Sequence, residues 1–224
     1  MKNILLLHGA LGSSDQLEQL ATSLAATHQV YRMNFSGHGR TPSRTHAATV
    51  QNYAHEVLDF LNEKQLSQIT IFGYSMGGYV ALWLARFYPA RVEKVVTLGT
   101  KFHWNEAEAQ KEIGKLNADK IKEKVPAFAE SLAQRHGEHE WHSILSKTAH
   151  LMHDLAKHQL HPSDFEKITC EVLLLLGDSD NMVTLEETEQ VQKILPNSQL
   201  EVLPGTPHPI EQVSVQLLAE KLNG

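Results

Sequence analysis

The stretch Gly73-Tyr74-Ser75-Met76-Gly77-Gly78 places a serine where its hydroxyl could act as a nucleophile. This G-x-S-x-G sequence follows the short apolar run 69–72 and precedes residues 79–85, which have the composition of a helix. A tight strand-to-helix turn strains the backbone of its middle residue and presents that side chain at a helix N-terminus, where partial positive charge stabilises an anion. The alternative is a small-residue turn without chemistry, because Gly and Ser are common in turns.

Candidate partners for this serine lie further along the chain. A serine hydroxyl needs a base to remove its proton, and the base needs a third group to fix its tautomer. Asp178, Asp180 and His208 all follow apolar runs, and the chain order Ser, Asp, His is one of the known orders of such triads. Either aspartate is a candidate for the acid, although Asp often fills a turn or cap instead.

The apolar pattern predicts six strands joined by helices. The strands are expected at 4–7, at Val30 to Phe35, and at 69–73, 92–98, 172–176 and 200–203, and the helices at 15–26, 50–65, 79–87, 184–194 and a terminal helix carrying Val213, Leu217, Leu218 and Leu222. Alternation of this kind predicts an α/β fold with a mostly parallel sheet, right-handed crossovers and helices on both faces. Sites in such sheets collect at the carboxyl ends of strands. His8-Gly9, Gly37 to Gly39, Ser75, Asp178 with Asp180, and His208 all follow a predicted strand.

Together these motifs resemble the α/β-hydrolase superfamily. The resemblance covers nearly the whole chain apart from one insertion, and it rests on His8-Gly9-Ala10, Ser36-Gly37-His38-Gly39-Arg40-Thr41, the 73–78 motif, Gly177-Asp178-Ser179-Asp180 and His208. Within the superfamily the chain is most similar to small esterases and monoacylglycerol-lipase-like enzymes. These often carry an HGA-type loop and a G-x-S-M-G-G turn.

The resemblance implies a role for each motif. Ser75 would be the nucleophile, His208 the general base and then acid, and the backbone amides of Ala10 and Met76 the oxyanion hole. Family members commonly place the acid three residues after the glycine, which here is Asp180. Elementary physics agrees for Met76, because the amide after the nucleophile at a helix N-terminus points toward the developing oxyanion.

The chain departs from the family pattern at three positions. Pro207 precedes the histidine where Gly is usual, Asn34 replaces an Asp, and Ser36 replaces the Pro of P-G-H-G. Proline fixes its own φ, so the His208 loop is expected to be stiff. These departures concern the details of two loops and leave the proposed triad unchanged.

The implied activity is hydrolysis of a carboxylic ester, with thioesters and monoglycerides included, through an acyl-enzyme on Ser75. The expected partner is a small-molecule ester with an acyl or apolar group. Two alternatives stay open: C–C bond hydrolysis or lyase chemistry on the same triad, and a non-catalytic receptor that uses the fold, since a fold does not determine function.

Residues 102–164 contain no strand-like run and are expected to form a helical cap inserted in a single domain, 1–224. Two to four helices fit their length, with breaks at Pro126 and Gly137. Some of their apolar side chains would line an acyl pocket, and most would pack the cap onto the core. The candidates are Phe102, Trp104, Ile113, Leu116, Val125, Phe128, Leu132, Trp141, Leu145, Leu151 and Met152.

Composition narrows the class of protein. Hydrophobic residues make up 42% and charged residues 21%, as in soluble globular proteins. A formal net charge of −6 argues against a nucleic-acid partner. The lone Cys170 cannot form an intrachain disulfide. The N-terminal apolar run is too short for a signal peptide, and no stretch approaches the length of a membrane span. We therefore expect a cytoplasmic protein. Oligomeric state stays open.

The fourteen histidines raise the question of a metal site. His136, His139 and His142 have helical i, i+3 spacing, but no cysteines and no H-E-x-x-H sequence accompany them. We therefore expect a polar helical surface there, structural hydrogen bonds for His8 and His38, and a packed thiol at Cys170. No G-x-G-x-x-G sequence is present, and neither a cofactor nor a metal is implied.

Overall fold

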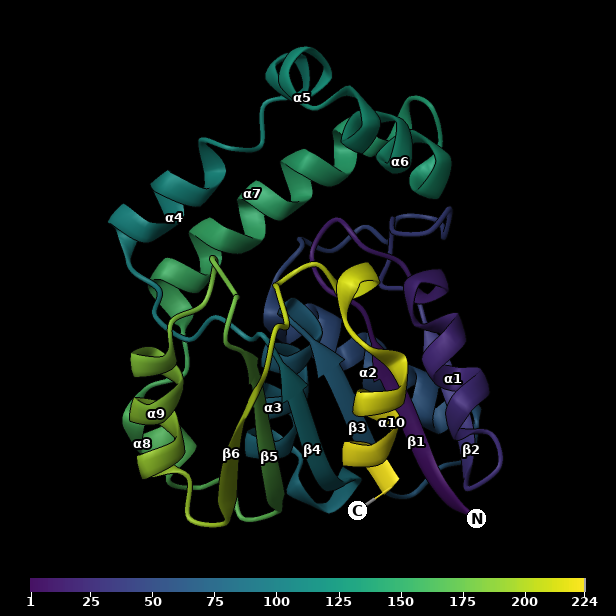
Figure 1. Ribbon diagram of the computed structural model, residues 1–224, viewed down its shortest axis with the longest axis vertical. Coiled ribbons are helices and arrows are strands. Elements are labelled where there is room, and N and C mark those ends of the chain that lie inside the picture. The colour runs from purple at the N-terminus through teal and green to yellow at the C-terminus, as the bar shows by residue number, and fades with distance from the viewer. Residues whose placement is uncertain (224) are drawn as a thin grey trace.

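One parallel sheet lies at the centre of the computed structural model, which describes residues 1–223 (Figure 1). Within those residues the sheet has six strands in the order β2-β1-β3-β4-β5-β6, and each neighbouring pair is parallel. The strands are β1 (Lys2–Leu7), β2 (His28–Met33), β3 (Ile69–Tyr74), β4 (Val92–Leu98), β5 (Glu171–Gly177) and β6 (Ser198–Leu203). Its inner strands read as continuous apolar runs because both faces are covered. The predicted α/β fold is confirmed.

Helices cover the two faces of this sheet. On one face α2 (Val50–Glu63), α3 (Met76–Phe87) and α9 (Leu185–Ile194) pack on side chains such as Leu5 and Leu7. On the other, α1 (Glu18–Leu24) and α10 (Val215–Asn223) pack on side chains such as Ile4 and Leu6. Successive strand residues thus face opposite layers. Short 3-10 helices η1 (Ser14–Leu17), η2 (Pro89–Arg91) and η3 (Ile210–Gln212) complete the connections.

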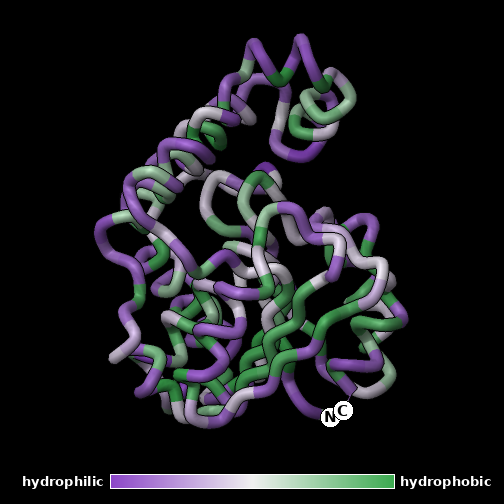
Figure 2. The backbone as a smooth tube through the Cα atoms, turned by 60° about the vertical axis from the view of Figure 1, so that its left-hand side comes forward, coloured by the Kyte–Doolittle hydropathy of each residue, from purple (hydrophilic) through white to green (hydrophobic). Residues whose placement is uncertain are grey.

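Residues 102–164, called the helical segment below, lie in the connection from β4 to β5. The helices of this connection are α4 (Glu106–Ile113), α5 (Ala118–Lys124), α6 (Pro126–His136), α7 (Glu140–His158) and α8 (Pro162–Phe165), the last of which ends one residue past the segment. Helices α4 to α7 lie beyond the carboxyl ends of the strands (Figure 1), and apolar residues are concentrated in the sheet below them (Figure 2). Among residues 1–223, no helix has the length and apolar character needed to cross a bilayer.

The number of helices predicted for this segment was wrong. The structure has five rather than two to four, because Asn105 and Asn117 each cap a separate short helix through their side chains and Pro162 begins a one-turn helix. The predicted breaks are confirmed: Pro126 is the first residue of α6, and Gly137 follows its last turn with φ of 115°.

Phe35 and Val213 lie outside the elements that were predicted to contain them. Strand β2 ends at Met33, and Phe35 lies in the following loop, fully buried, with its ring 4.8 Å from that of Tyr53 and 5.0 Å from that of His8. Val213 is buried ahead of α10 rather than within it. Both residues continue the apolar pattern of the neighbouring element but are not part of its backbone hydrogen bonding. Hydrophobic periodicity alone does not reveal where that hydrogen bonding ends.

Candidate active site

Ser75 occupies the turn between β3 and α3 in a strained conformation. Its φ of 51° and ψ of −114° are unusual for a residue with a side chain, and such strain costs about 1–3 kcal/mol. Surrounding hydrogen bonds hold it: its amide donates to the Leu98 carbonyl at 2.8 Å, and its carbonyl accepts from the Gly78 amide and from Thr100 Oγ1, both at 3.0 Å. The expected sharp turn is present, with Ser75 as the N-cap of α3.

Gly77 allows α3 to approach the end of β1 through backbone alone. A Cβ at this position would lie 2.6 Å from the Leu7 carbonyl oxygen and 2.8 Å from that of His8. Real Cβ atoms are not found so close to backbone, so glycine is required here. This contact brings the first turn of α3, with the Met76 amide, against the loop that carries Ala10.

An aspartate and a histidine pair at the ends of the two neighbouring strands. His208 Nδ1 lies 2.7 Å from Asp180 Oδ2, and these side chains are only 8% and 2% exposed. The other carboxylate oxygen accepts the amides of Met182 at 2.8 Å and Val183 at 2.9 Å. Burial would raise the pKa of Asp180, but the hydrogen bonds and charge of His208 and those two amides hold this pKa below its usual value. An ionised Asp180 fixes the proton on Nδ1, which leaves Nε2 free to accept one.

Asp178 has a different environment. Its carboxylate is exposed and accepts hydrogen bonds from Ser179 Oγ at 2.9 Å and from the Thr206 amide at 3.3 Å. These partners hold the turn after β5 against the loop after β6. Of the two candidate acids, Asp180 is the one in contact with His208, and Asp178 has the turn role considered as its alternative.

One pocket brings the predicted residues together. Ser75, His208, Ala10 and Met76 all line it, and most of its remaining wall is apolar: Val50, Tyr79, Trp104, Leu151, Met152, Leu155, Met182 and Val183, with Lys101 and Glu112 as charged members. Of the eleven apolar candidates from the helical segment, Trp104, Leu151 and Met152 line this pocket. Others, such as Leu132 and Trp141, pack against their neighbours within the segment.

Comparison with known proteins places the chain in a family. A family model described as the alpha/beta hydrolase fold matches residues 2–135, more than half of the chain. The chain belongs to the alpha/beta hydrolase family. Its fold, its parallel sheet and its resemblance to esterases as a group were therefore correctly predicted.

Individual relatives of this alpha/beta hydrolase are distant. An esterase of Escherichia coli is 33% identical over 98 residues, an alignment covering 42% of this chain and 37% of that protein. The sn-1-specific diacylglycerol lipase of Danio rerio is 22% identical over 234 residues, covering 92% and 72% respectively. A thermophilic esterase from Thermogutta terrifontis has the same fold, with a TM-score of 0.80 at 21% identity, over 99% of this chain and 88% of that one. These similarities support hydrolase chemistry in general.

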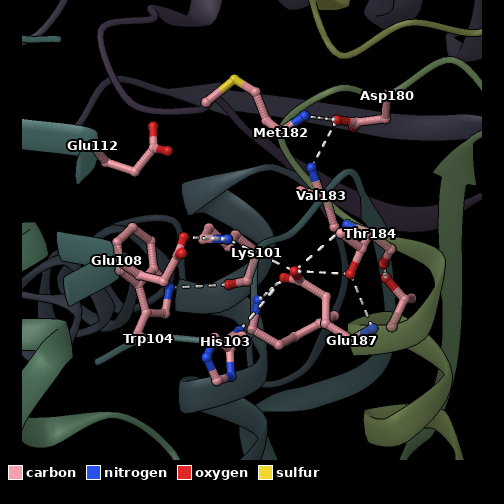
Figure 3. A network of polar contacts seen from close by, with 12 residues as sticks. Lys101, His103, Trp104, Glu108, Glu112, Asp180, Met182, Val183, Thr184 and Glu187 are labelled. Atoms are coloured by element: carbon pink, nitrogen blue, oxygen red, sulfur yellow. Dashed lines mark hydrogen bonds and ion pairs between the residues drawn. The ribbon is translucent and has the colours of Figure 1, made fainter. Parts of the chain in front are cut away.

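Sequence reasoning missed a carboxylate that joins two parts of this alpha/beta hydrolase. Glu187 of α9 is buried and accepts a hydrogen bond from the Phe102 amide at 2.9 Å. Its carboxylate also accepts a hydrogen bond from the Thr184 hydroxyl at 3.2 Å and lies 3.7 Å from Lys101 Nζ (Figure 3). It thereby links the start of the helical segment to the loop that carries Asp180. The available signal was the capping box from Thr184 to Glu187, which predicts a helix start but not the link to Phe102.

The expected polar histidine surface was wrong for His136. His139 and His142 are not buried, but His136 is 1% exposed and lies in a row with His38 and His8, with ring centroids 5.8 and 5.0 Å apart. His8 has the structural role predicted for it, because its Nε2 accepts the Phe35 amide at 3.3 Å. Within residues 1–223, no group of three or more His, Cys, Asp or Glu side chains is placed to hold a metal ion.

The buried histidines predict that acid destabilises the fold. Burial lowers the pKa of His8 to about 4 and lowers those of His38 and His136. Below pH 6.5 the unfolded chain therefore binds protons that the folded chain does not, and the free energy of unfolding falls as pH falls. For His8, whose folded pKa is about 4, the slope approaches about 1.4 kcal/mol per pH unit and the loss is about 2 kcal/mol at pH 5. His38 and His136 contribute in the same direction. Urea unfolding between pH 7.5 and pH 5 measures this loss.

A pair of variants separates the effect of one buried histidine on the pH dependence of stability from the effect of the acidic side chains, which also bind protons in this range. In His38→Phe the new ring would lie near Phe35 and Tyr53. We expect the free energy of unfolding to depend less steeply on pH in this variant, by the contribution of one titrating group. His139→Gln at an exposed position should leave the pH dependence unchanged. Equal slopes in both variants and the native chain would contradict the prediction.

Proposed function

We propose that this alpha/beta hydrolase is a serine esterase that cleaves carboxylic esters, thioesters and monoglycerides included, through an acyl-enzyme on Ser75. The observation that carries the proposal is the Asp180–His208 pair at 2.7 Å, whose histidine lines the same pocket as the strained Ser75. A histidine with one nitrogen held by a buried carboxylate and the other free is the arrangement that activates a serine hydroxyl.

In the proposed reaction His208 Nε2 removes the proton from Ser75 Oγ as that oxygen attacks the ester carbonyl. The amides of Ala10 and Met76 donate to the oxyanion that forms, in a setting where such donors are worth several kcal/mol (about 3–4). The C–O bond to the leaving group then breaks, and His208 returns its proton to the leaving oxygen. Water then attacks the acyl-enzyme carbonyl while His208 Nε2 removes its proton. The bond between the acyl carbon and Ser75 Oγ breaks, His208 returns the proton to Oγ, and the carboxylic acid is released. Every step uses the groups of the chain and water alone.

The pocket wall supports an acyl or other apolar group as the part of the substrate that is recognised. Trp104, Leu151 and Met152 of the helical segment form part of that wall, so we propose that residues 102–164 act as a cap within a single domain. The esterase and lipase activities named for the relatives support the same substrate class.

Covalent labelling by a fluorophosphonate tests the proposal. We expect stoichiometric labelling, located by mass spectrometry on the peptide that contains Ser75, and no labelling of the Ser75→Ala variant. Short acyl p-nitrophenyl esters should be hydrolysed, and a panel of vinylogous diketones should not. An unlabelled native chain would indicate a receptor, and turnover of diketones alone would indicate C–C hydrolysis.

A further inference from the structure

We infer that Arg135 and His136, at the end of α6, position the loop that carries the Ala10 amide, so that the helical segment contributes to the geometry of the reaction as well as covering the substrate. This inference rests on the proposed function. Arg135 Nη1 and His136 Nε2 both donate to the carbonyl oxygen of Leu11, each at 3.0 Å. Leu11 follows Ala10 directly, 124 residues before Arg135 in the chain.

The backbone at Leu11 explains why its carbonyl needs these donors. Residues 9–12 form a turn closed by a hydrogen bond from the Gly12 amide to the Gly9 carbonyl at 3.1 Å, and Leu11 occupies its third position with φ of 57°. Glycine is the residue favoured there in such turns, and a leucine costs about 1–2 kcal/mol. Two donors on the Leu11 carbonyl, one of them charged, offset that cost and hold the turn in the conformation that sets the direction of the Ala10 amide.

Arg135 also reaches the loop of the proposed base. Its Nη2 lies 3.1 Å from Oε1 of Glu211, which belongs to η3 and comes three residues after His208. The same carboxylate oxygen accepts a hydrogen bond from Nε2 of Gln16, which belongs to η1, just after the loop with Ala10. One guanidinium on the helical segment therefore connects the loop with Ala10 to the loop with His208.

His136 adds a second connection of the same kind. Its Nδ1 accepts the Gly39 amide at 3.1 Å while its Nε2 donates to Leu11. Both bonds require the neutral ring with its proton on Nε2, and burial lowers the pKa of His136, which favours that neutral form. The end of α6 thus holds two strand-end loops of the sheet at once.

The test compares Arg135→Met with Arg40→Met. Arg40 is the control because it also joins a strand-end loop to α6, but its side chain comes from the loop. Its Nη2 donates to the Gln134 carbonyl at 3.1 Å, and it has no hydrogen bond to Leu11 or Glu211. Removing one donor of an oxyanion hole lowers kcat by about 10²–10³-fold. Misplacing the Ala10 amide in Arg135→Met should therefore lower kcat by about 10–100-fold. KM should change by less than about threefold, because ground-state contacts stay in place. Arg40→Met should change kcat by less than about twofold.

Conservative variants test whether the donors are what matters. Arg135→Lys should recover part of kcat, and His136→Gln, which keeps a donor, should retain more activity than His136→Leu. A short alkylboronic acid, which forms a tetrahedral adduct on the serine, should bind Arg135→Met more weakly by about the same factor as the loss in kcat.

Hydrogen–deuterium exchange in the peptide containing residues 9–12 reports on the loop without requiring turnover. We expect faster exchange in Arg135→Met and not in Arg40→Met. If the native chain neither labels nor turns over, the proposed function fails while this exchange difference still supports positioning. Unchanged exchange and kcat in Arg135→Met, or an equal loss in Arg40→Met, would overturn the inference.

Discussion

Replacing Ser75 by alanine should reduce kcat for a p-nitrophenyl ester by about 10⁴-fold or more while leaving the protein folded. The loss follows from the proposed chemistry, because without Oγ no acyl-enzyme can form and only binding and the oxyanion donors would remain. Stability should be little affected, since the Ser75 side chain makes no capping hydrogen bond on α3 and the turn is held by backbone contacts. Steady-state kinetics and thermal unfolding measure the two quantities separately.

Ser179→Ala provides the matched control for this experiment. Ser179 also follows a strand of the sheet, but its hydroxyl donates to the exposed Asp178 and does not line the pocket. We expect its kcat to stay within about twofold of the native value, as for most surface substitutions. Native turnover by Ser75→Ala would refute the assignment of the nucleophile.

Asp180→Asn should be the second most damaging substitution, with a loss in kcat of about 10³–10⁴-fold near pH 7, by analogy with the same change in serine proteases. An asparagine can donate its amide to His208 Nδ1, which would move the ring proton to Nε2 and leave no acceptor for the serine proton. The two amides that now bind the carboxylate, from Met182 and Val183, would keep the loop in place.

Asp178→Asn separates the role of Asp180 from a general effect of losing an acid at the end of β5. Asp178 is exposed and holds the turn through Ser179 and Thr206, and asparagine can accept the same hydrogen bonds. Its kcat is expected to stay within about threefold of native. The reverse ranking of the two variants would move the acid assignment to Asp178.

The sheet and the strand-end residues could be predicted because their signals are local. Continuous apolar runs such as 92–98 and 172–176 are sufficient to identify buried parallel strands. A parallel sheet then brings Ser75 and His208 to the same edge without any further information. The Asp180–His208 contact is the consequence of that topology, since both follow neighbouring strands.

The contacts between the helical segment and the loops could not be predicted in the same way. Arg135 and His136 lie in a polar helix whose composition indicates a solvated surface, and their partner Leu11 is more than a hundred residues away. Leu11 itself shows no sign in the sequence of a positive φ, which glycine would have suggested. The link from Glu187 to Phe102 depends likewise on how two elements pack, which local patterns do not contain.

The direct backbone contact at Gly77 has a consequence for engineering. Main chain meets main chain there, so backbone atoms rather than side chains set the closest approach of α3 to the end of β1. Repacking the apolar side chains beneath for heat resistance should therefore leave the gap between the Met76 and Ala10 amides unchanged. A single added methyl group in Gly77→Ala would widen that gap even in an otherwise native core.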